Sequence, residues 1–295
     1  MFGINTKEGL YAKVLIFGAT GMAGHMVAMY LSKIKEKYTV YNVCHNSKLN
    51  ENSILCDIND IDKINSIIDY INPDVIINCI GVLNKSAELD IKNTIYVNTF
   101  FPKLLDRIGE IKNIKILHLS TDCVFNGSKG NYSEESFKDE DGIYGLSKNF
   151  GEIYGKNSLT IRTSIIGPEL KNGSGLFNWF MHQEGIIKGF TNVYWNGITT
   201  LELAKVIDKA LDLNIQGIYN IANESKISKY NLLNLIKSEF NKDNIEIEKF
   251  EEIHCDKSLI SVKKDFNYKV NPYEVMLKDM HTWMEENKSL YKLYF

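Results

Sequence analysis

Three polar side chains in the middle of the chain have types and spacing suited to acid–base chemistry. Tyr144 and Lys148 stand four residues apart at the start of a predicted helix, and therefore share one of its faces. A tyrosine with its ordinary pKa of about 10 is a poor proton donor near neutrality, and an adjacent ammonium favours phenolate and lowers that pKa. Thr121, at the end of a predicted strand, can hydrogen-bond the same substrate oxygen. These residues predict a catalytic site that reduces a carbonyl group, with Tyr144 protonating the nascent alkoxide.

A glycine-rich turn near the start of the chain is typical of dinucleotide binding. The turn, GATGMAG at 18–24, directly follows the apolar run 13–17 and opens a helix. Glycines let the backbone approach a pyrophosphate at the helix N-terminus, where free N–H groups favour negative charge. The position between a strand and a helix makes this GxxGxxG pattern specific. The cofactor-binding candidates here are Gly18, Thr20, Gly21, Met22, Ala23 and Gly24.

The end of the second predicted strand bears on the choice of nicotinamide cofactor. NAD enzymes usually carry an acidic residue there, about 20 residues after the glycine turn, which binds the ribose hydroxyls. This chain has CHNSK at 44–48, without a carboxylate, and donors such as His45 and Asn46 suit a 2′-phosphate. The sequence therefore favours NADPH, with NADH as the alternative.

The elements that must position these residues are apolar strands alternating with helices. The predicted strands cover 13–17, 39–44, 53–56, 74–80, 114–120 and 158–164. The predicted helices cover 61–71, 94–108, which contains a proline expected to kink it, and 144–155. Near-continuous apolar strands separated by helices indicate a parallel sheet covered on both faces. Right-handed crossovers then give a doubly wound α/β fold of the Rossmann type.

The second half of the chain has a different pattern. Residues 176–197 are rich in aromatic side chains and irregular in period, whereas 198–211 reads as a helix and 217–222 as a strand that returns to the main sheet. Amphipathic helices are predicted at 229–241 and 275–287. We therefore expect a dinucleotide-binding domain over 1–165 and a smaller, interleaved, mainly substrate-binding region over 166–295.

Composition restricts the class of partner. The chain has 295 residues and a formal net charge of -3, so it offers no basic surface for nucleic acid. Its five cysteines form no CxxC pair or Cys/His cluster, which predicts reduced, buried thiols and no metal site. No apolar run is long enough to span a bilayer, and residues 1–12 lack the apolar core of a signal peptide. We expect a cytoplasmic protein that does not bind membranes.

Several motifs together resemble the dTDP-4-dehydrorhamnose reductase family of extended short-chain dehydrogenases. They are GATGMAG at 18–24, NCIG at 78–81, STDCVFNGSKGNYSEES from Ser120 and YGLSKNFGE from Tyr144. The resemblance covers nearly the whole chain and is densest between Leu119 and Glu152. It implies an NADPH-dependent enzyme that reduces the 4-keto group of a nucleotide-linked 6-deoxyhexose for cell-surface polysaccharide synthesis. Related enzymes often dimerise through helices beside the sheet, so the resemblance suggests a homodimer.

The resemblance also implies roles for individual residues. Thr121, Tyr144 and Lys148 would be catalytic. The further cofactor contacts would be Asp57, Ile58, Cys79, Ile80, Gly81, Asn98, Lys148 and Ser164. The substrate contacts would be Thr121, Asp122, Val124, Phe125, Tyr144 and Ile165, with Trp179 and Trp195 as candidates to stack on a base or a sugar. For Asn98 and the two tryptophans, ordinary interior packing is an equal alternative.

Departures from the family pattern leave the substrate open. Cys123 stands where the family has tyrosine, and Ile165 to Pro168 replace an aromatic-containing run. The 178–200 stretch is similar to a branch thought to reduce UDP-linked 4-keto-2-acetamido sugars. An epimerase–reductase that uses a cysteine at position 123 is an alternative, although Glu169 stands where its histidine should be. A nucleotide-binding regulatory subunit without turnover is another, and a 4,6-dehydratase lacks its acid–base pair here.

Three further features carry expectations about their surroundings. We expect His25 on the surface of the first helix, and His118 as a hydrogen-bonded histidine of the core. The acidic loop from Glu134 to Asp141 is expected to be a solvated surface, positioned to act as a lid before Tyr144.

Overall fold

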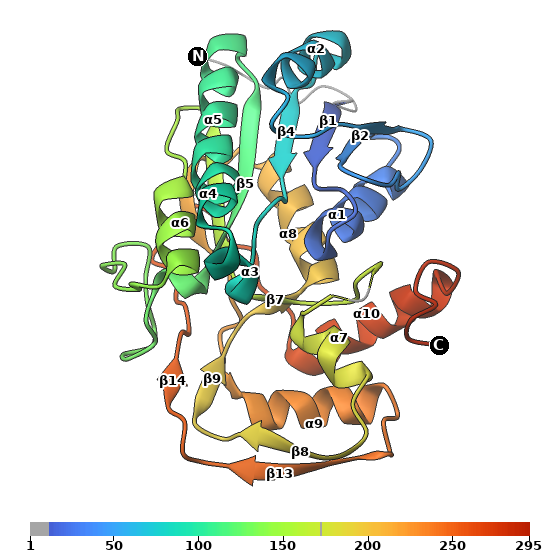
Figure 1. Ribbon diagram of the computed structural model, residues 1–295, viewed down its shortest axis with the longest axis vertical. Coiled ribbons are helices and arrows are strands. Elements are labelled where there is room, and N and C mark those ends of the chain that lie inside the picture. Colours follow the sequence, from blue (N-terminus) through green and yellow to red (C-terminus); the bar gives the residue numbers. More distant parts are fainter. Residues whose placement is uncertain (1–11, 172) are drawn as a thin grey trace.

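The computed structural model describes residues 12–171 and 173–295, and its centre is a seven-stranded parallel sheet (Figure 1). The strand order is β11-β6-β5-β4-β1-β2-β3. The strands are β1 (Ala12–Phe17), β2 (Tyr38–Cys44), β3 (Ser53–Leu55), β4 (Val75–Asn78), β5 (Lys115–Thr121), β6 (Ser158–Thr163) and β11 (Gly217–Asn220). The predicted doubly wound fold is confirmed. Residues 1–11, where the sequence shows no signal-peptide core, lie outside the described part.

Helices cover both faces of the sheet because successive residues of the strands pack into different cores. In β1, Val14 and Ile16 belong to one apolar cluster, and Leu15 and Phe17 belong to the other. The first cluster contains α1 (Met22–Lys33) and α8 (Thr200–Asp212), and the second contains α2 (Ile61–Ile71) and α5 (Phe101–Lys112). A strand that is apolar on both sides is what a sheet buried on both faces requires.

The helical stretch predicted at 94–108 is built differently from expectation. It consists of α4 (Ile91–Ile95), a π-helical turn η1 (Tyr96–Phe100) and α5, after the short α3 (Asn84–Leu89). Pro102 lies in the first turn of α5, where a missing N–H is tolerated, so it begins that helix instead of kinking one. Asn98 sits in the π-helical turn, a feature that often occurs at functional sites.

Most of the remaining elements lie beyond the carboxyl ends of the sheet strands, in the lower part of Figure 1. They are η2 (Asp122–Val124), α6 (Ile143–Gly151), β7 (Ile165–Ile166), α7 (Leu176–Met181), β8 (Gly185–Phe190), β9 (Val193–Trp195), β10 (Ile198–Thr199), β12 (Ile227–Ser228), α9 (Lys229–Glu239), β13 (Ile245–Phe250), β14 (Cys255–Asp256) and α10 (Tyr273–Glu286). Of these, α6 runs up the side of the sheet. The aromatic-rich segment 176–197 therefore forms one short helix and two strands. Among the described helices, none combines the length and apolar character that crossing a membrane requires.

His25 is not on the surface, so that prediction is wrong. It is fully buried, with Nδ1 2.8 Å from the Gly21 carbonyl oxygen and Nε2 3.0 Å from the Tyr291 hydroxyl. Burial lowers the pKa of His25 to about 4, so the ring is neutral at physiological pH. The residue ties the glycine turn to the far end of the chain, a contact that helix periodicity alone cannot reveal.

Candidate active site

The glycine turn after β1 has a backbone that only glycine fits at two positions. Gly18 has φ +79°, and a Cβ there would lie 2.8 Å from Cγ1 of Ile80. At Gly24, a Cβ would lie 2.1 Å from the Gly18 carbonyl oxygen. Gly21 precedes α1 as its N-cap and provides no side chain to cap the helix. The first turn of α1 therefore keeps backbone N–H groups that a phosphate can accept from.

This turn lies where the winding of the sheet changes direction. β1 pairs with β2 on one side and β4 on the other, and the chain reaches β4 only after forming β3 at the edge. Ligands of open α/β sheets bind in the crevice outside the strand ends at such a point. The predicted cofactor residues at these strand ends are Gly18 to Gly24 after β1, His45 and Asn46 after β2, Asp57 and Ile58 after β3, and Cys79, Ile80 and Gly81 after β4. The open helix terminus at this point of the sheet fits the pyrophosphate of a dinucleotide.

The ends of β2 and β3 carry a feature that the sequence did not reveal. Asp57 Oδ2 lies 3.9 Å from Nε2 of the exposed His45, so a carboxylate does reach the end of β2, from the neighbouring strand. The backbone N–H and side chain of Asn59, and then the charge of His45, lower the pKa of Asp57. Asp57 is therefore a carboxylate near neutrality, within reach of the same ligand groups as His45.

The loop after β4 lies between the glycine turn and α6 and contacts both. A Cβ at Gly81 would lie 3.6 Å from Oδ1 of Asn98 and 4.0 Å from Nζ of Lys148. Asn98 accepts a hydrogen bond from the N–H of Val82 at 2.9 Å, and its amide donates to the Val82 carbonyl and to the Ser147 hydroxyl. Asn98 thus fastens this loop to the helix that bears Lys148.

Thr121, Tyr144 and Lys148 are brought together at the end of β5. Thr121 is the last residue of β5, and Tyr144, in the first turn of α6, lies close enough for the Thr121 hydroxyl to act on the pKa of its phenol. Oγ1 of Thr121 also accepts from the N–H of Cys123 at 3.1 Å and donates to Asp122 at 3.0 Å. One turn further along α6, the buried Lys148 donates from Nζ to the Leu119 carbonyl at 2.6 Å.

The charges around Tyr144 differ from expectation. Burial and then the neighbouring Cys123 raise the pKa of the phenol above its ordinary value, and the Thr121 hydroxyl opposes this. Lys148 does not measurably change the pKa of the phenol. The expected lowering of the Tyr144 pKa by Lys148 is therefore wrong for this structure. Burial lowers the pKa of Lys148 itself to about 8. Lys148 can therefore gain and lose a proton close to neutrality.

Some predicted substrate residues have buried side chains. Val124 and Phe125 form a small apolar cluster with Tyr132 and Leu259, in which Phe125 stacks on Tyr132. Trp195 is only 3% exposed. These side chains pack in the interior, and their contact with substrate stays a prediction.

Of the other predicted substrate and cofactor residues of this region, Ser164, Ile165 and Trp179 remain partly accessible, whereas Asp122 is buried. Ser164 accepts a hydrogen bond from Nε1 of Trp195 at 2.8 Å, and Ile165 pairs with β10. Trp179, 40% exposed on α7, has its ring partly in solvent. Asp122 is buried beside Thr121, and burial raises the pKa of its carboxyl.

Lys229 belongs to this site, although the sequence gave no signal for it. It is the first residue of α9, and its Nζ lies 5.2 Å from the centre of the Trp195 ring. Burial lowers the pKa of Lys229 to about 8, against the charges of Asp122, Cys123 and Cys255. The ammonium thus covers the tryptophan and faces the residues that follow Thr121.

Cys123 is not a reactive thiol in these surroundings. Burial, followed by the charge of Asp122, raises the pKa of Cys123 to about 12. A thiolate is the nucleophilic and basic form of cysteine, and this environment disfavours it.

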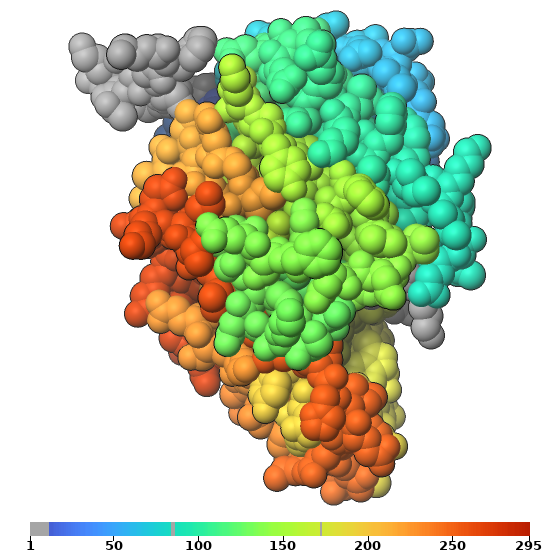
Figure 2. Space-filling view, turned by 90° about the vertical axis from the view of Figure 1, so that its left-hand side faces the viewer, coloured from blue at the N-terminus to red at the C-terminus, as the bar shows by residue number. Residues whose placement is uncertain are grey.

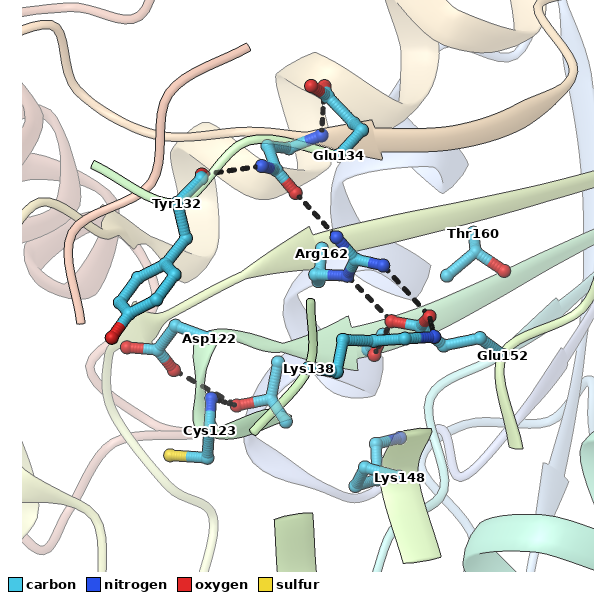
Figure 3. A network of polar contacts seen from close by, with 12 residues as sticks. Asp122, Cys123, Tyr132, Glu134, Lys138, Lys148, Glu152, Thr160 and Arg162 are labelled. Carbon is cyan, nitrogen blue, oxygen red and sulfur yellow. Dashed lines mark hydrogen bonds and ion pairs between the residues drawn. The ribbon is translucent and has the colours of Figure 1, made fainter. Parts of the chain in front are cut away.

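Behind the site, a buried charge network fixes the ends of β5, α6 and β6 (Figure 3). The Glu152 carboxylate accepts from Nε and Nη2 of Arg162 at 2.6 and 2.9 Å, from Ser120 at 2.9 Å and from Lys138 at 2.8 Å. Arg162 and Glu152 are 1% and 0% exposed. Figure 3 shows the carboxylate between the guanidinium of Arg162 and the ammonium of Lys138. Sequence reasoning assigned Arg162 only to a strand end and missed this pair.

The acidic loop 134–141 is held by the protein, so the prediction of a solvated surface is wrong for its main carboxylates. Glu134 accepts from the N–H groups of Asn220 and Val262 at 2.9 and 3.0 Å. Glu140 pairs with Lys257 at 2.9 Å. Figure 2 shows the green segment that contains this loop against the orange C-terminal segments, where the molecule narrows. These contacts tie the loop to the C-terminal part of the chain, and its role as a lid stays a prediction.

This combination of fold and site is that of the extended short-chain dehydrogenases. The chain belongs to the family described as RmlD substrate binding domain, whose sequence profile matches residues 12–258. The resemblance to the dTDP-4-dehydrorhamnose reductase family is thereby confirmed.

Known relatives agree in fold. A dTDP-4-dehydrorhamnose reductase from Aggregatibacter actinomycetemcomitans is 33% identical over 167 residues, 55% of this chain and 54% of that protein, so the chain matches about half the length of this curated relative. A hypothetical dTDP-4-dehydrorhamnose reductase from Sulfolobus tokodaii is 28% identical, with a TM-score of 0.76 over 89% of this chain and 98% of that one. The Bacillus anthracis dTDP-4-dehydrorhamnose reductase in complex with NADP has a TM-score of 0.78 over 93% and 100% of the chains, and at 19% identity it shows the fold alone.

Proposed function

We propose that this protein is an NADPH-dependent reductase of the 4-keto group of a nucleotide-linked 6-deoxyhexose. The observation that carries the proposal is the placement of Thr121 at the end of β5 beside Tyr144 of α6, with Lys148 one turn further along α6 and next to Gly81 at the switch point of the sheet. The family membership supports the same reaction, and the named relatives are dTDP-4-dehydrorhamnose reductases.

The cofactor would lie across the carboxyl ends of β1 to β4. The backbone of Gly21, Met22 and Ala23 would hold its pyrophosphate, and Lys148 would bind the ribose beside the nicotinamide. When bound, the reduced nicotinamide supplies the hydride. His45 and Asn46 favour the 2′-phosphate of NADPH. Asp57, at 3.9 Å from His45, keeps NADH as the alternative.

The side chains of the chain itself would handle the proton and the orientation of the substrate. Thr121 would hydrogen-bond the substrate carbonyl, and Tyr144 would give its phenolic proton to the oxygen as hydride reaches the carbon. The raised pKa makes the phenol a weaker acid than expected, but it keeps the phenol protonated at neutral pH, and an alkoxide is basic enough to take this proton as it forms. Asp122, beside Thr121, would hold the sugar.

The segment after residue 165 would supply most of the sugar-nucleotide pocket. Lys229 is the strongest candidate there, because its half-buried ammonium faces Asp122 and Cys123 and can donate to an acceptor oxygen of the ligand. Both dTDP-4-dehydrorhamnose and a UDP-linked 4-keto-2-acetamido sugar offer such oxygens. We further propose that the protein acts in the cytoplasm, in precursor synthesis for cell-surface polysaccharide. A homodimer remains a prediction.

The rival epimerase–reductase function is disfavoured by Cys123. An epimerase must remove a carbon-bound proton with a base, and a thiol whose pKa is raised to about 12 rarely supplies a thiolate near neutrality.

The proposal is tested by NADPH oxidation with a panel of dTDP- and UDP-linked 4-keto-6-deoxy sugars, followed by mass spectrometry of the products in deuterated water. We expect oxidation with at least one sugar and no deuterium on ring carbons. Deuterium at a ring carbon would support the epimerase–reductase. NADPH binding without oxidation of any sugar would support a regulatory subunit.

A further inference from the structure

A row of buried side chains leads from β4 through β5 to Lys148. Asn78 ends β4, and His118 lies beside it in register on β5. Both residues are fully buried. Nδ2 of Asn78 lies 3.2 Å from Nδ1 of His118, and Nε2 of the same ring lies 3.5 Å from Nζ of Lys148. His118 is thus a core histidine as expected, and one of its two ring nitrogens faces a residue of the site.

The backbone N–H of Ile80 determines which ring nitrogen of His118 carries the hydrogen. This N–H donates to Oδ1 of Asn78 over 3.1 Å, so the amide group that faces His118 is NH₂, which only donates. Nδ1 of His118 must therefore accept. Burial and then the charge of Lys148 lower the pKa of His118 well below its usual value, so the ring is neutral and its proton lies on Nε2.

The Nε2–H group then faces Nζ of Lys148. A lysine ammonium has no lone pair and cannot accept this hydrogen, whereas the neutral amine can. The hydrogen bond from Lys148 to the Leu119 carbonyl is available to both forms. The contact with His118 therefore distinguishes the two protonation states of Lys148 and favours the neutral amine over the ammonium.

Other titratable groups around this pair act in both directions. Burial favours the amine of Lys148, whereas Glu152 at the end of α6 and Cys79 after β4 favour the ammonium. Lys103 of α5 acts on His118 and keeps it neutral. The contact with His118 adds to burial in opposing the two acidic groups.

We propose that His118 is a positioning residue that biases Lys148 toward its uncharged amine and so lets Lys148 release a proton near neutral pH. The inference rests on the proposed function for its purpose. Once Tyr144 has given its proton to the product, the Lys148 ammonium can return one toward the phenolate, and solvent reprotonates the amine.

The direct test is a titration of Lys148 in the free protein by NMR, with lysine labelled with ¹³C at the ε carbon and Lys148→Arg used for assignment. We expect a midpoint near 8 in the wild type. In His118→Phe, loss of a donor worth about 1 kcal/mol should raise the midpoint by roughly 0.5 to 1 unit. An unchanged or lowered midpoint in a folded His118→Phe protein would overturn the inference.

Two further variants make the titration specific. His25→Phe removes another fully buried histidine, which contacts Gly21 and Tyr291, and should leave the Lys148 midpoint unchanged. If His118→Phe does not fold, Asn78→Val replaces it. Without the Asn78 donor the His118 ring can move its proton to Nδ1 and accept from the ammonium, so the midpoint should again rise. A midpoint unchanged in Asn78→Val would contradict the inference.

The dependence of kcat on pH provides the functional counterpart. If Lys148 must be protonated to return a proton, kcat falls as pH rises through its pKa of about 8, and this fall moves to higher pH in His118→Phe. An equal loss of rate at every pH would indicate a merely structural role and overturn the inference. Because the NMR titration needs no substrate, a shifted midpoint without turnover of any sugar would overturn the proposed function alone.

Discussion

The cofactor side and the substrate side of the crevice are built in different ways. The cofactor side is mostly backbone from one short segment, in which Gly18 and Gly24 allow α1 to begin with open N–H groups. The proposed substrate side consists of side chains from distant segments, such as Asp122 and Lys229, near the ion pair of Glu140 with Lys257. A continuous motif can therefore be recognised in a sequence, whereas an assembled surface becomes visible only once the chain is folded. The following experiments should affect one side and spare the other.

The largest effect is expected when the network behind the substrate side is broken. Arg162→Met leaves the Glu152 carboxylate buried without its main partner, which should lower the free energy of unfolding by about 3 to 5 kcal/mol. Urea denaturation of the wild type and of Arg162→Met measures this difference in the free energy of unfolding. Arg107→Met, which breaks the exposed pair with Glu110, is the matched control and should cost less than about 1 kcal/mol. Equal costs for the two variants would show that the buried pair does not anchor the site.

A pH-dependent loss of stability should reveal one long-range contact on the cofactor side. Burial lowers the pKa of His25 from 6.5 to about 4, so its contribution is present above pH 6.5 and lost as pH falls through 4. The loss should reach about 3 kcal/mol. It is measured as the difference between wild type and His25→Phe in denaturation curves from pH 7 to 4. Parallel curves would mean that His25 is not buried neutral in solution.

A methyl group in the glycine turn should affect the cofactor side alone. In Gly24→Ala the Cβ meets the Gly18 carbonyl at 2.1 Å, so the turn must open and NADPH affinity should fall about a hundredfold, equivalent to about 2.7 kcal/mol. Fluorescence titration with NADPH measures this change in affinity. Gly185→Ala, whose methyl has no atom within 4 Å, strains the backbone of β8 at φ +71° but leaves the glycine turn unchanged, so it should bind NADPH like the wild type. Wild-type affinity in Gly24→Ala would exclude this turn as the pyrophosphate site.

Loss of the ammonium over Trp195 should affect the substrate side alone. Lys229→Met should raise KM for the sugar nucleotide about tenfold, through loss of one charged hydrogen bond, with NADPH affinity unchanged. Lys226→Met is the matched control, because Lys226 is exposed and paired with Asp256. If KM is unchanged in Lys229→Met, the lysine has no role in binding substrate.

The sequence predicted the sheet and the position of the glycine turn well, because their signals are local. Apolar runs such as 13–17 and the glycine turn are each specified by a few consecutive residues. The spacing of Tyr144 and Lys148 likewise predicts a shared helix face. Its errors concern contacts that join distant segments. His25 meets Tyr291, and Lys229 covers a tryptophan that the sequence had offered as a ligand contact.

Electrostatic expectations failed for a related reason. The acidic loop was expected to be solvated, yet Glu134 and Glu140 find donors in the C-terminal part of the chain. The effect of Lys148 on Tyr144 was inferred from helix spacing alone, whereas burial and Cys123 dominate in the folded protein. A pKa depends on burial and on neighbours in space, neither of which a helical spacing specifies.

The central claim is that the Tyr144 phenol gives the proton to the reduced carbonyl, and single-turnover NADPH oxidation by Tyr144→Phe tests it most directly. Phenylalanine keeps the ring and removes only the hydroxyl. The account predicts that Tyr144→Phe binds NADPH as the wild type does and loses more than about nine tenths of the rate with the best 4-keto sugar, because removal of a general acid typically costs a factor of about 10² to 10⁴. A rate that stays above a tenth of the wild-type value, with cofactor affinity intact, would contradict it.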